Sequence, residues 1–253
     1  MNTRDQTATR GQPSYVWRAG QERRFQMVRR WTSLRNRRVL DVGCGVGMYV
    51  DAFLRETPHV FGAEIEHERA QKALLRCTAP AGGHPPAASV IQAPGERLPF
   101  SNEVFDVVFS HEVLEHVADD RACLEEMVRV ASPSGRILIF VPNRLYPFET
   151  HGVMWRGHYH FGNVPLINWL PGPVRDRLAP HVRAYTTRGL QHLLEGLPLC
   201  LIHHTQIYPG YDNVLARRPA LGRLLRRVSY ACEHTVLRAF GLSHFLVAEK
   251  ESF

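Results

Sequence analysis

The sequence contains no run of about 18 apolar residues, the length that a membrane-spanning helix requires. Residues 1–12 are polar and contain no apolar stretch of the kind found in a secretory signal. The five cysteines are scattered, and none forms a Cys-x-x-Cys pair. These absences predict a cytoplasmic protein with reduced thiols, no structural zinc site and a disordered segment over residues 1–12.

Lysine is also scarce, since Lys72 and Lys250 are the only lysines among 31 basic residues. Arginine therefore carries the net charge of +7. A basic surface is typical of nucleic-acid binding, of contact with anionic lipid, or of a solvated surface without a partner. The sequence contains no recognisable nucleic-acid-binding module and no base-stacking aromatic motif set among basic residues. Nucleic acid is therefore the less favoured partner.

Strands and helices alternate along most of the chain. Short apolar runs predict seven strands, over residues 38–43, 59–65, 89–92, 105–110, 136–141, 199–208 and 244–250. Periodic apolar positions predict helices over residues 15–35, 48–55, 66–76, 119–130 and 187–195. This alternation predicts an α/β protein with a Rossmann-like, doubly wound, mostly parallel seven-stranded sheet.

Two segments interrupt this pattern. Residues 143–183 are rich in His, Pro, Trp, Tyr and Gly and have little periodicity, which predicts a cap insertion after the fifth strand. Residues 209–243 predict a helical insertion before the last strand. We expect both segments to belong to a single domain over residues 13–253.

The helical insertion contains an amphipathic helix over residues 219–240. Its apolar face consists of Leu221, Leu224, Leu225, Val228, Cys232 and Val236, and its basic face of Arg223, Arg226, Arg227 and Arg238. The pattern favours a helix that packs its apolar face on its own domain. The alternative is that this helix and apolar cap residues dock the protein on anionic lipid at the inner membrane face. Those cap residues are Trp155, Tyr159, Phe161, Trp169 and Leu170.

A glycine loop follows the first strand, with glycines at positions 43, 45 and 47. Glycine allows positive φ and close approach of a ligand, and the free N–H groups of the next helix point at the loop. Met48 occupies the place of the third glycine in a dinucleotide-binding GxGxxG motif, which disfavours a nicotinamide cofactor. Glu64 ends the next strand, where a carboxylate can accept hydrogen bonds from both hydroxyls of a ribose.

The motifs together resemble those of class I S-adenosylmethionine (SAM) dependent methyltransferases, in the broad type 11 group. The similar segments are residues 39–47, 62–64, 94–100, 105–117 and 127–143. The resemblance covers about residues 35–143 and returns weakly near the C-terminus. It implies a Rossmann-like fold and SAM as the cofactor.

The resemblance also implies which residues contact SAM. The methionine part would lie among Asp41, Gly43, Cys44, Gly45 and Gly47, and the ribose would be held by Glu64. Ile65, Gly95 and Glu96 would lie against the adenine, and Ser110 and His111 beneath the methionine and sulfonium. Pro94 stands where the family often has an aspartate that binds the adenine amine, so backbone groups or Glu96 must serve instead.

Methyl transfer from SAM needs alignment of the acceptor and, for a hydroxyl acceptor, a group that accepts its proton. Histidine is the natural base near neutral pH, and the candidates are His111, His151, His158 and His160. We expect no metal. His111 and His116 are five residues apart and would not share a helix face, and the His158-Tyr159-His160 run has no third ligand nearby.

These observations favour a SAM-dependent methyltransferase that acts on a small-molecule or lipid-like acceptor. Oxygen is the favoured methyl acceptor atom, with nitrogen and carbon as alternatives. The fourth strand is not followed by the Asn-Pro-Pro-Tyr-type tetrapeptide that amino-group methylases of nucleic-acid bases often carry. An RNA or DNA methyltransferase and a SAM-binding module without turnover are the competing interpretations.

Overall fold

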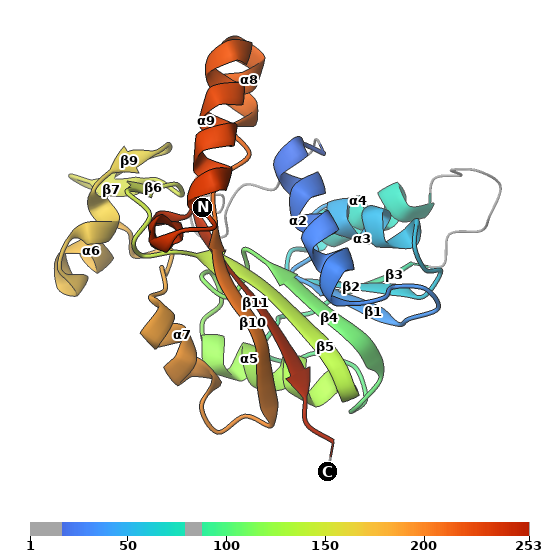
Figure 1. The fold of residues 1–253 in the computed structure, drawn as a ribbon. Helices are drawn as coiled ribbons and strands as arrows, with labels where there is room; N and C mark the ends of the chain where they lie inside the picture. The colour runs from blue at the N-terminus through green and yellow to red at the C-terminus, as the bar shows by residue number, and fades with distance from the viewer. Residues whose placement is uncertain (1–16, 79–87, 253) are drawn as a thin grey trace.

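The computed structural model describes residues 17–78 and 88–252, so the prediction for residues 1–12 lies outside the described residues. Seven strands form one sheet, in the order β10-β11-β5-β4-β1-β2-β3 (Figure 1). They are β1 (Val39–Val42), β2 (Val60–Glu64), β3 (Ser89–Gln92), β4 (Phe105–His111), β5 (Ala131–Pro142), β10 (Leu199–Ile207) and β11 (Ser243–Lys250). Strands β1 to β5 are parallel, and β11 is antiparallel to both of its neighbours. The predicted Rossmann-like sheet is confirmed.

Helices cover both faces of this sheet (Figure 1). They are α2 (Ala19–Trp31), α3 (Met48–Leu54) and α4 (His67–Thr78) on one face, and α5 (Asp120–Val130) and α7 (Thr187–Leu194) on the other. Strand β1 shows how one short run fills both cores. Val39 packs in the core with α2, α3 and α4, whereas Leu40 and Val42 pack in the core with α5 and α7. Successive strand residues point to opposite faces, which is why an unbroken apolar run marks a strand buried on both sides.

The strand order reverses between β1 and β4. From β1 the chain runs outward to β2 and β3, and it then returns to form β4 and β5 on the other side. Ligands of open α/β sheets bind at the carboxyl ends of the strands beside such a reversal. The glycine loop after β1 and residues 111–117 after β4 therefore meet at the position where a ligand is expected.

Strand β5 begins at Ala131, five residues before its predicted start. Residues 132–135 form an irregularity inside the strand, where the register with β4 shifts between Phe105 and Val107. Ser134 has a φ of 59°, so the local turn geometry survives within the longer strand.

The predicted cap consists of short elements. They are β6 (Phe148–Glu149), β7 (Val153–Trp155), β8 (His158–His160), β9 (Val164–Pro165), η1 (Ile167–Trp169) and α6 (Gly172–Leu178). The cap leaves and rejoins the sheet at one point, because Arg144 N donates to Tyr185 O and Tyr185 N donates to Pro142 O. The buried Arg175 side chain binds Glu149 at 2.9 Å and holds α6 to β6.

The helical insertion comprises α8 (Asp212–Arg217), α9 (Pro219–Cys232) and η2 (Val236–Phe240). Pro219 begins α9 as predicted, but the helix ends at Cys232, and Thr235 caps the separate η2 turn. Helices α8 and α9 form a hairpin that projects away from the sheet (Figure 1). Leu224 is 58% exposed and Val228 54% exposed, so the expectation that the apolar face packs on its own domain is wrong. None of the described helices is long and apolar enough to cross a membrane.

Candidate active site

A cavity of about 830 Å³ opens at the carboxyl ends of β1, β2 and β4. Nine of the residues predicted to contact SAM line it: Asp41, Gly43, Cys44, Gly45, Glu64, Ile65, Gly95, Glu96 and His111. Gly47 and Ser110 do not line it. A Cβ atom on Gly47 would lie 3.0 Å from Ala73 Cα, so this glycine permits the packing of α3 on α4. Ser110 is fully buried within β4.

The glycine loop is bound tightly to β2. Gly43 and Gly45 have φ values of 71° and 57°. The N–H groups of Gly43 and Cys44 both donate to Ala63 O, at 2.8 and 3.0 Å. A Cβ atom on Gly43 would lie 2.3 Å from Val113 Cγ2, so only glycine fits between the loop and the segment after β4. The loop therefore presents bare backbone to the cavity.

Glu64 connects the loop to the end of β2. Its carboxylate accepts hydrogen bonds from Gly45 N and Glu66 N, each at 2.9 Å. These bonds fix the carboxylate at the edge of the cavity, and each carboxylate oxygen keeps further capacity to accept a hydrogen bond. The predicted ribose acid and glycine loop form one hydrogen-bonded unit.

Asp41 lies deeper, at the end of β1, and is 3% exposed. No donor in the described part of the chain hydrogen-bonds to its carboxylate. Burial, followed by the charge of Glu64, raises the pKa of Asp41 well above its ordinary value. A buried carboxylate without a partner is costly, and a cationic ligand group beside it would remove that cost. The ammonium group of a methionine moiety has the required charge, so the residues present fit SAM.

The far end of the cofactor region is less polar. Ile65 is 46% exposed and offers an apolar surface for a flat ring. The Glu96 carboxylate accepts from Ala118 N at 2.8 Å and from Asp119 N at 3.4 Å. A Cβ atom on Gly95 would lie 2.7 Å from Cys123 Sγ, so this backbone approaches α5 too closely for a side chain.

The four candidate histidines separate into three kinds. His111 lines the cavity, but burial, followed by the charge of Arg24, lowers its pKa to about 3. The imidazole is therefore neutral and weakly basic, and the reason for choosing it as a base is lost. His158 and His160 are exposed on β8 and do not line the cavity. Of the three candidate histidines in the cap, His151 alone lines it.

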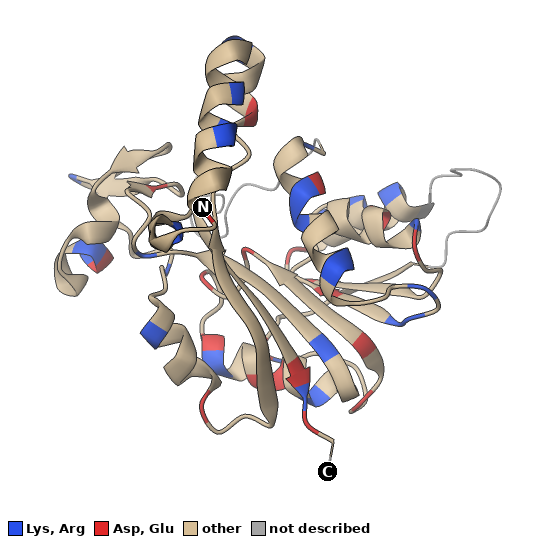
Figure 2. Cartoon of the chain, viewed as in Figure 1, with Lys and Arg blue, Asp and Glu red and all other residues tan. Residues whose placement is uncertain are grey.

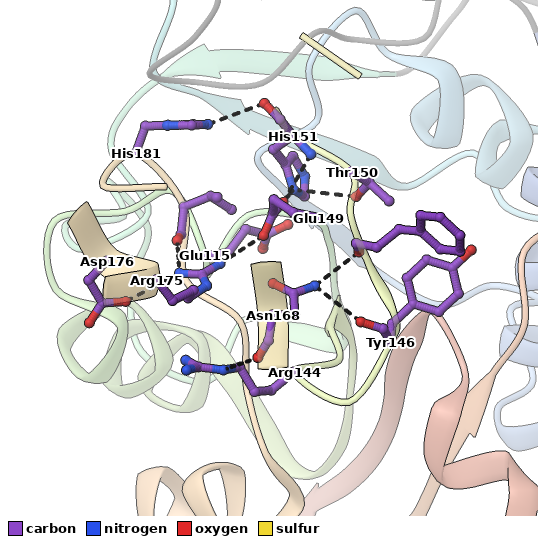
Figure 3. A network of polar contacts seen from close by, with 12 residues as sticks. Glu115, Arg144, Tyr146, Glu149, Thr150, His151, Asn168, Arg175, Asp176 and His181 are labelled. Carbon is purple, nitrogen blue, oxygen red and sulfur yellow. Dashed lines mark hydrogen bonds and ion pairs between the residues drawn. The ribbon is translucent and has the colours of Figure 1, made fainter. Parts of the chain in front are cut away.

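A group of polar side chains missed by the sequence analysis lies beside His151. Glu112, Glu115 and His116 follow β4 in a segment that is not helical, and Glu112 has a φ of 57°. His151 Nε2 lies 3.7 Å from Glu112 Oε2, and His151 Nδ1 lies 3.1 Å from Glu149 Oε1. Figure 3 shows Glu115, Glu149 and His151 close together at the base of the cap. We call Glu112, Glu115, His116 and His151 the acceptor-end cluster.

Burial shapes the electrostatics of this cluster. Burial, followed by the charge of Glu112, raises the pKa of Glu115 well above its ordinary value. Burial, followed by the charge of His151, lowers the pKa of His116 to about 4, so its imidazole is neutral near pH 7. In both residues, burial disfavours the charged form of a group that lacks a compensating partner, and the pKa shifts accordingly.

The sheet, the loop and the strand-end acid define a Rossmann-like fold with a cavity suited to a nucleoside. Residues 40–139 match the family described as "Methyltransferase domain". An uncharacterized methyltransferase of Mycolicibacterium gilvum is 37% identical over 128 residues, which cover 51% of this chain and 48% of that protein. A ubiquinone biosynthesis O-methyltransferase of Xylella fastidiosa is 32% identical over 124 residues, 48% of either chain. The chain spans about half the length of the curated relatives it matches.

The fold is also similar to that of solved proteins. A SAM-dependent methyltransferase of Mesorhizobium loti has a TM-score of 0.60 at 17% identity, with 92% of this chain and 98% of that chain covered. Residues 40–139 thus match a methyltransferase domain and the fold is that of solved SAM-dependent methyltransferases, as the motifs predict; SAM is the cofactor of this class.

Proposed function

We propose that the protein transfers a methyl group from SAM to a hydroxyl oxygen of a small-molecule or lipid-like acceptor. The observation that carries this proposal is the two-ended cavity. One end is the glycine loop with Asp41 and Glu64, and the other is lined by Glu112, His116 and His151. When bound, SAM supplies a methyl group activated by its sulfonium.

The residues of the cofactor end have distinct roles in this proposal. Asp41 accepts hydrogen bonds from the methionine ammonium, and the loop backbone at Gly43 and Gly45 lies against the ligand. Glu64 accepts hydrogen bonds from the ribose hydroxyls, and Ile65 packs on the adenine. The backbone of Gly95 and the carboxylate of Glu96 stand at the adenine edge, where Pro94 supplies no acid. SAM held in this way would direct its methyl group toward the acceptor end.

Oxygen as the acceptor atom is supported by the chemistry of the cluster and by names among the relatives. Glu112 and His151 present a carboxylate and an imidazole, which suit a hydroxyl that must lose a proton. Several relatives are named ubiquinone biosynthesis O-methyltransferases. Transfer to nitrogen or carbon is the alternative, and the transfer assay with pools of candidate acceptors, described below, distinguishes the three.

The first test measures cofactor binding. Isothermal titration calorimetry should show binding of SAM and none of NAD. Glu64→Ala should weaken SAM binding by about 1.5–3 kcal/mol, the scale of hydrogen bonds to a charged group. Glu68→Ala, which removes an exposed acid from α4, should leave the affinity unchanged. Equal affinities of the Glu64→Ala variant and the wild type would contradict the ribose assignment.

The second test measures transfer. Radiolabelled SAM is incubated with pools of phenols, quinols, lipid extract and RNA, and the label is followed into product. Label in a hydroxyl-bearing small molecule or lipid supports the proposal. Label in RNA alone, or SAM binding without transfer to any pool, would replace it with one of the two competing interpretations.

We also propose that the α8–α9 hairpin contacts an anionic lipid surface, at the inner membrane face if the protein is cytoplasmic. Leu221, Leu224 and Val228 are exposed on α9, and Arg223 and Arg227 are exposed beside them. Figure 2 shows basic residues along this projecting hairpin. Exposed apolar side chains next to arginines are typical of helices that lie in a membrane interface.

A further inference from the structure

The acceptor-end cluster brings potential metal ligands together from two distant parts of the chain. One ligand atom each of Glu115, His116 and His151 lies within 4.8 Å of the other two. The imidazole rings of His116 and His151 are 5.1 Å apart between centroids. Glu112 lies on the same side, with Oε2 3.7 Å from His151 Nε2. Two imidazoles and one carboxylate thus surround one small volume, and the carboxylate of Glu112 adjoins it beside His151.

Glu115 is the least explained member of this cluster. It is 1% exposed, and among the described residues no donor reaches either of its carboxylate oxygens, although the Glu112 carboxylate lies close enough to share a proton with it. His116 Nε2 lies 4.0 Å from Glu115 Oε1, beyond hydrogen-bonding distance. The nearby Arg175 guanidinium is engaged by Glu149 and by Val182 O instead. A buried carboxylate in this position requires either a proton or a cation.

Both histidines are oriented by partners behind them. His151 Nδ1 lies 3.1 Å from Glu149 Oε1, and the other oxygen of Glu149 binds Arg175. His116 Nδ1 lies 3.4 Å from His181 O. A carboxylate and a carbonyl only accept hydrogen bonds, so each Nδ1 is the donor, and in the neutral ring this leaves the Nε2 lone pair for a ligand. Metal-binding histidines usually have this arrangement, with the second ring nitrogen bonded to a carboxylate or backbone carbonyl.

We propose that Glu115, His116 and His151, with Glu112 as the fourth ligand, bind a divalent first-row transition metal ion. Imidazole donors favour zinc, iron, cobalt or nickel over magnesium and calcium, which prefer oxygen ligands. The structure also explains why the sequence predicts no metal. The possible partners of His116 as metal ligands are Glu115 and the cap residue His151, 35 residues away. Helix spacing in the sequence considers it only together with His111.

The position of the ion bears on the acceptor. Glu112, His116 and His151 line the cavity, so an ion that they bind would face its open volume. A divalent ion lowers the pKa of a coordinated hydroxyl, which would remove the need for a histidine base. The favoured acceptors are then phenols or similar compounds with an ionisable hydroxyl. This extension rests on the proposed methyl transfer, whereas the metal site does not.

The test begins with the full chain, made without a polyhistidine tag and freed of metal with a chelator. Co²⁺ is titrated in while visible absorbance is recorded, and Zn²⁺ is then added in competition. We expect one Co²⁺ per chain, a ligand-field spectrum, and loss of that spectrum with Zn²⁺. His151→Ala and Glu115→Gln should each lower the Co²⁺ affinity by about 100-fold or more, beyond the 10–100-fold typical of losing an outer partner. His158→Ala, which removes an exposed histidine of the same cap, should leave it unchanged.

Glu115→Gln separates the metal from its main alternative, a proton shared between Glu112 and Glu115. Glutamine imitates a protonated glutamate, so this variant should fold and should lose only a metal ligand. Unchanged Co²⁺ affinity in Glu115→Gln, or the absence of saturable binding to the wild type, would overturn the metal site. Calorimetry with SAM on the same metal-free chain keeps the two proposals separate. Co²⁺ binding without transfer to any acceptor would overturn the methyl-transfer proposal alone, and full transfer by the metal-free chain would overturn the role of the ion.

Discussion

At the cofactor end of the cavity, the glycine loop and Glu64 come from one short stretch of chain, whereas the acceptor end joins segments that are distant in sequence. Gly45 and Glu64 are 19 residues apart and hydrogen-bond directly. Glu112 follows β4, whereas His151 lies in the cap after β5, and the two side chains meet in space. Glu149, which orients His151, is in turn held by Arg175, 26 residues further along the chain. The first end depends on local backbone geometry and the second on tertiary packing. Local geometry leaves a signature in the sequence, and tertiary packing does not.

The largest expected effect lies in the cofactor end. Gly45→Arg should abolish SAM binding while the protein still folds, because Gly45 has positive φ and lines the cavity, where a side chain would occupy the ligand's space. Calorimetry measures the binding, and circular dichroism checks the fold. Gly157→Arg is the matched control, since Gly157 has a φ of +79° but nothing within 4 Å of an added Cβ. Wild-type affinity in the Gly45→Arg variant would break the assignment of the loop.

The second prediction addresses the acceptor end. His151→Ala should lower turnover by on the order of 100-fold with little change in SAM affinity, the usual scale for a group that acts on the acceptor. His158→Ala and His160→Ala should retain wild-type turnover, because both side chains are exposed on β8. Steady-state kinetics with the acceptor identified from the panel provides the measurement. A similar loss in all three variants would show that the cap matters through its fold rather than through His151.

The same contrast explains how much the sequence can predict. The seven strands follow from short apolar runs, because a strand buried on both faces needs an unbroken one. The positions of the glycine loop and of Glu64 follow from the spacing of the glycines after the first strand and of the acid at the end of the second. By contrast, the pKa of His111 depends on burial among Tyr49, Phe109 and Phe140, which no local pattern encodes.

The acceptor-end cluster could not be found by helix spacing because its segment is not a helix. The only sequence signal was the density of acids and histidines in residues 111–116. The cap was predicted as an insertion without regular structure, because strands of two or three residues are too short to show alternation. The positions of these short strands depend on the buried ion pair between Arg175 and Glu149, two residues that are 26 positions apart in the sequence.

A third prediction separates ligand binding from folding within the cofactor end. Asp41→Asn should weaken SAM binding by about 1.5–3 kcal/mol, because the methionine ammonium loses a charged partner. The same change should raise the free energy of unfolding at pH 7, since it removes a buried carboxylate whose charge is disfavoured. The pKa of Asp41 is raised in the folded state, so its cost is absent below the ordinary aspartate range and grows as pH rises from that range to the folded pKa.

Thermal unfolding without SAM measures this second effect. The gain in stability should therefore be seen at neutral pH and disappear at acid pH. Asp51→Asn is the control, because Asp51 lies on the surface of α3 and pairs with Arg55. A fall in stability at pH 7 for Asp41→Asn would show that an unseen partner already satisfies the carboxylate.

The smallest expected effect concerns the α8–α9 hairpin, which lies outside both ends of the cavity. Arg223 and Arg227 are exposed, whereas Arg226 binds Asp212 and Gly210 O and belongs to the hairpin itself. Each surface arginine is expected to contribute about 1 kcal/mol to binding of an anionic membrane and little to a neutral one. Arg223→Glu should thus lower partitioning onto anionic vesicles roughly fivefold or more, and Arg223→Glu with Arg227→Glu further. Flotation of vesicles of phosphatidylcholine with and without phosphatidylglycerol measures this at low salt.

The control variant carries Arg30→Glu and Arg188→Glu, which lie on α2 and α7 and change the net charge by the same amount. If binding depends on the hairpin, the control should float nearly as well as the wild type, and high salt should release both because it screens the arginines. Leu224→Ser with Val228→Ser should weaken binding to anionic vesicles without changing its salt dependence, since these side chains contribute apolar area rather than charge. Equal losses in the two charge variants would mean that net charge alone drives binding. A wild-type protein that never floats with anionic lipid at low salt would leave the hairpin without a lipid role, and the acceptor would then have to reach the cavity from solution.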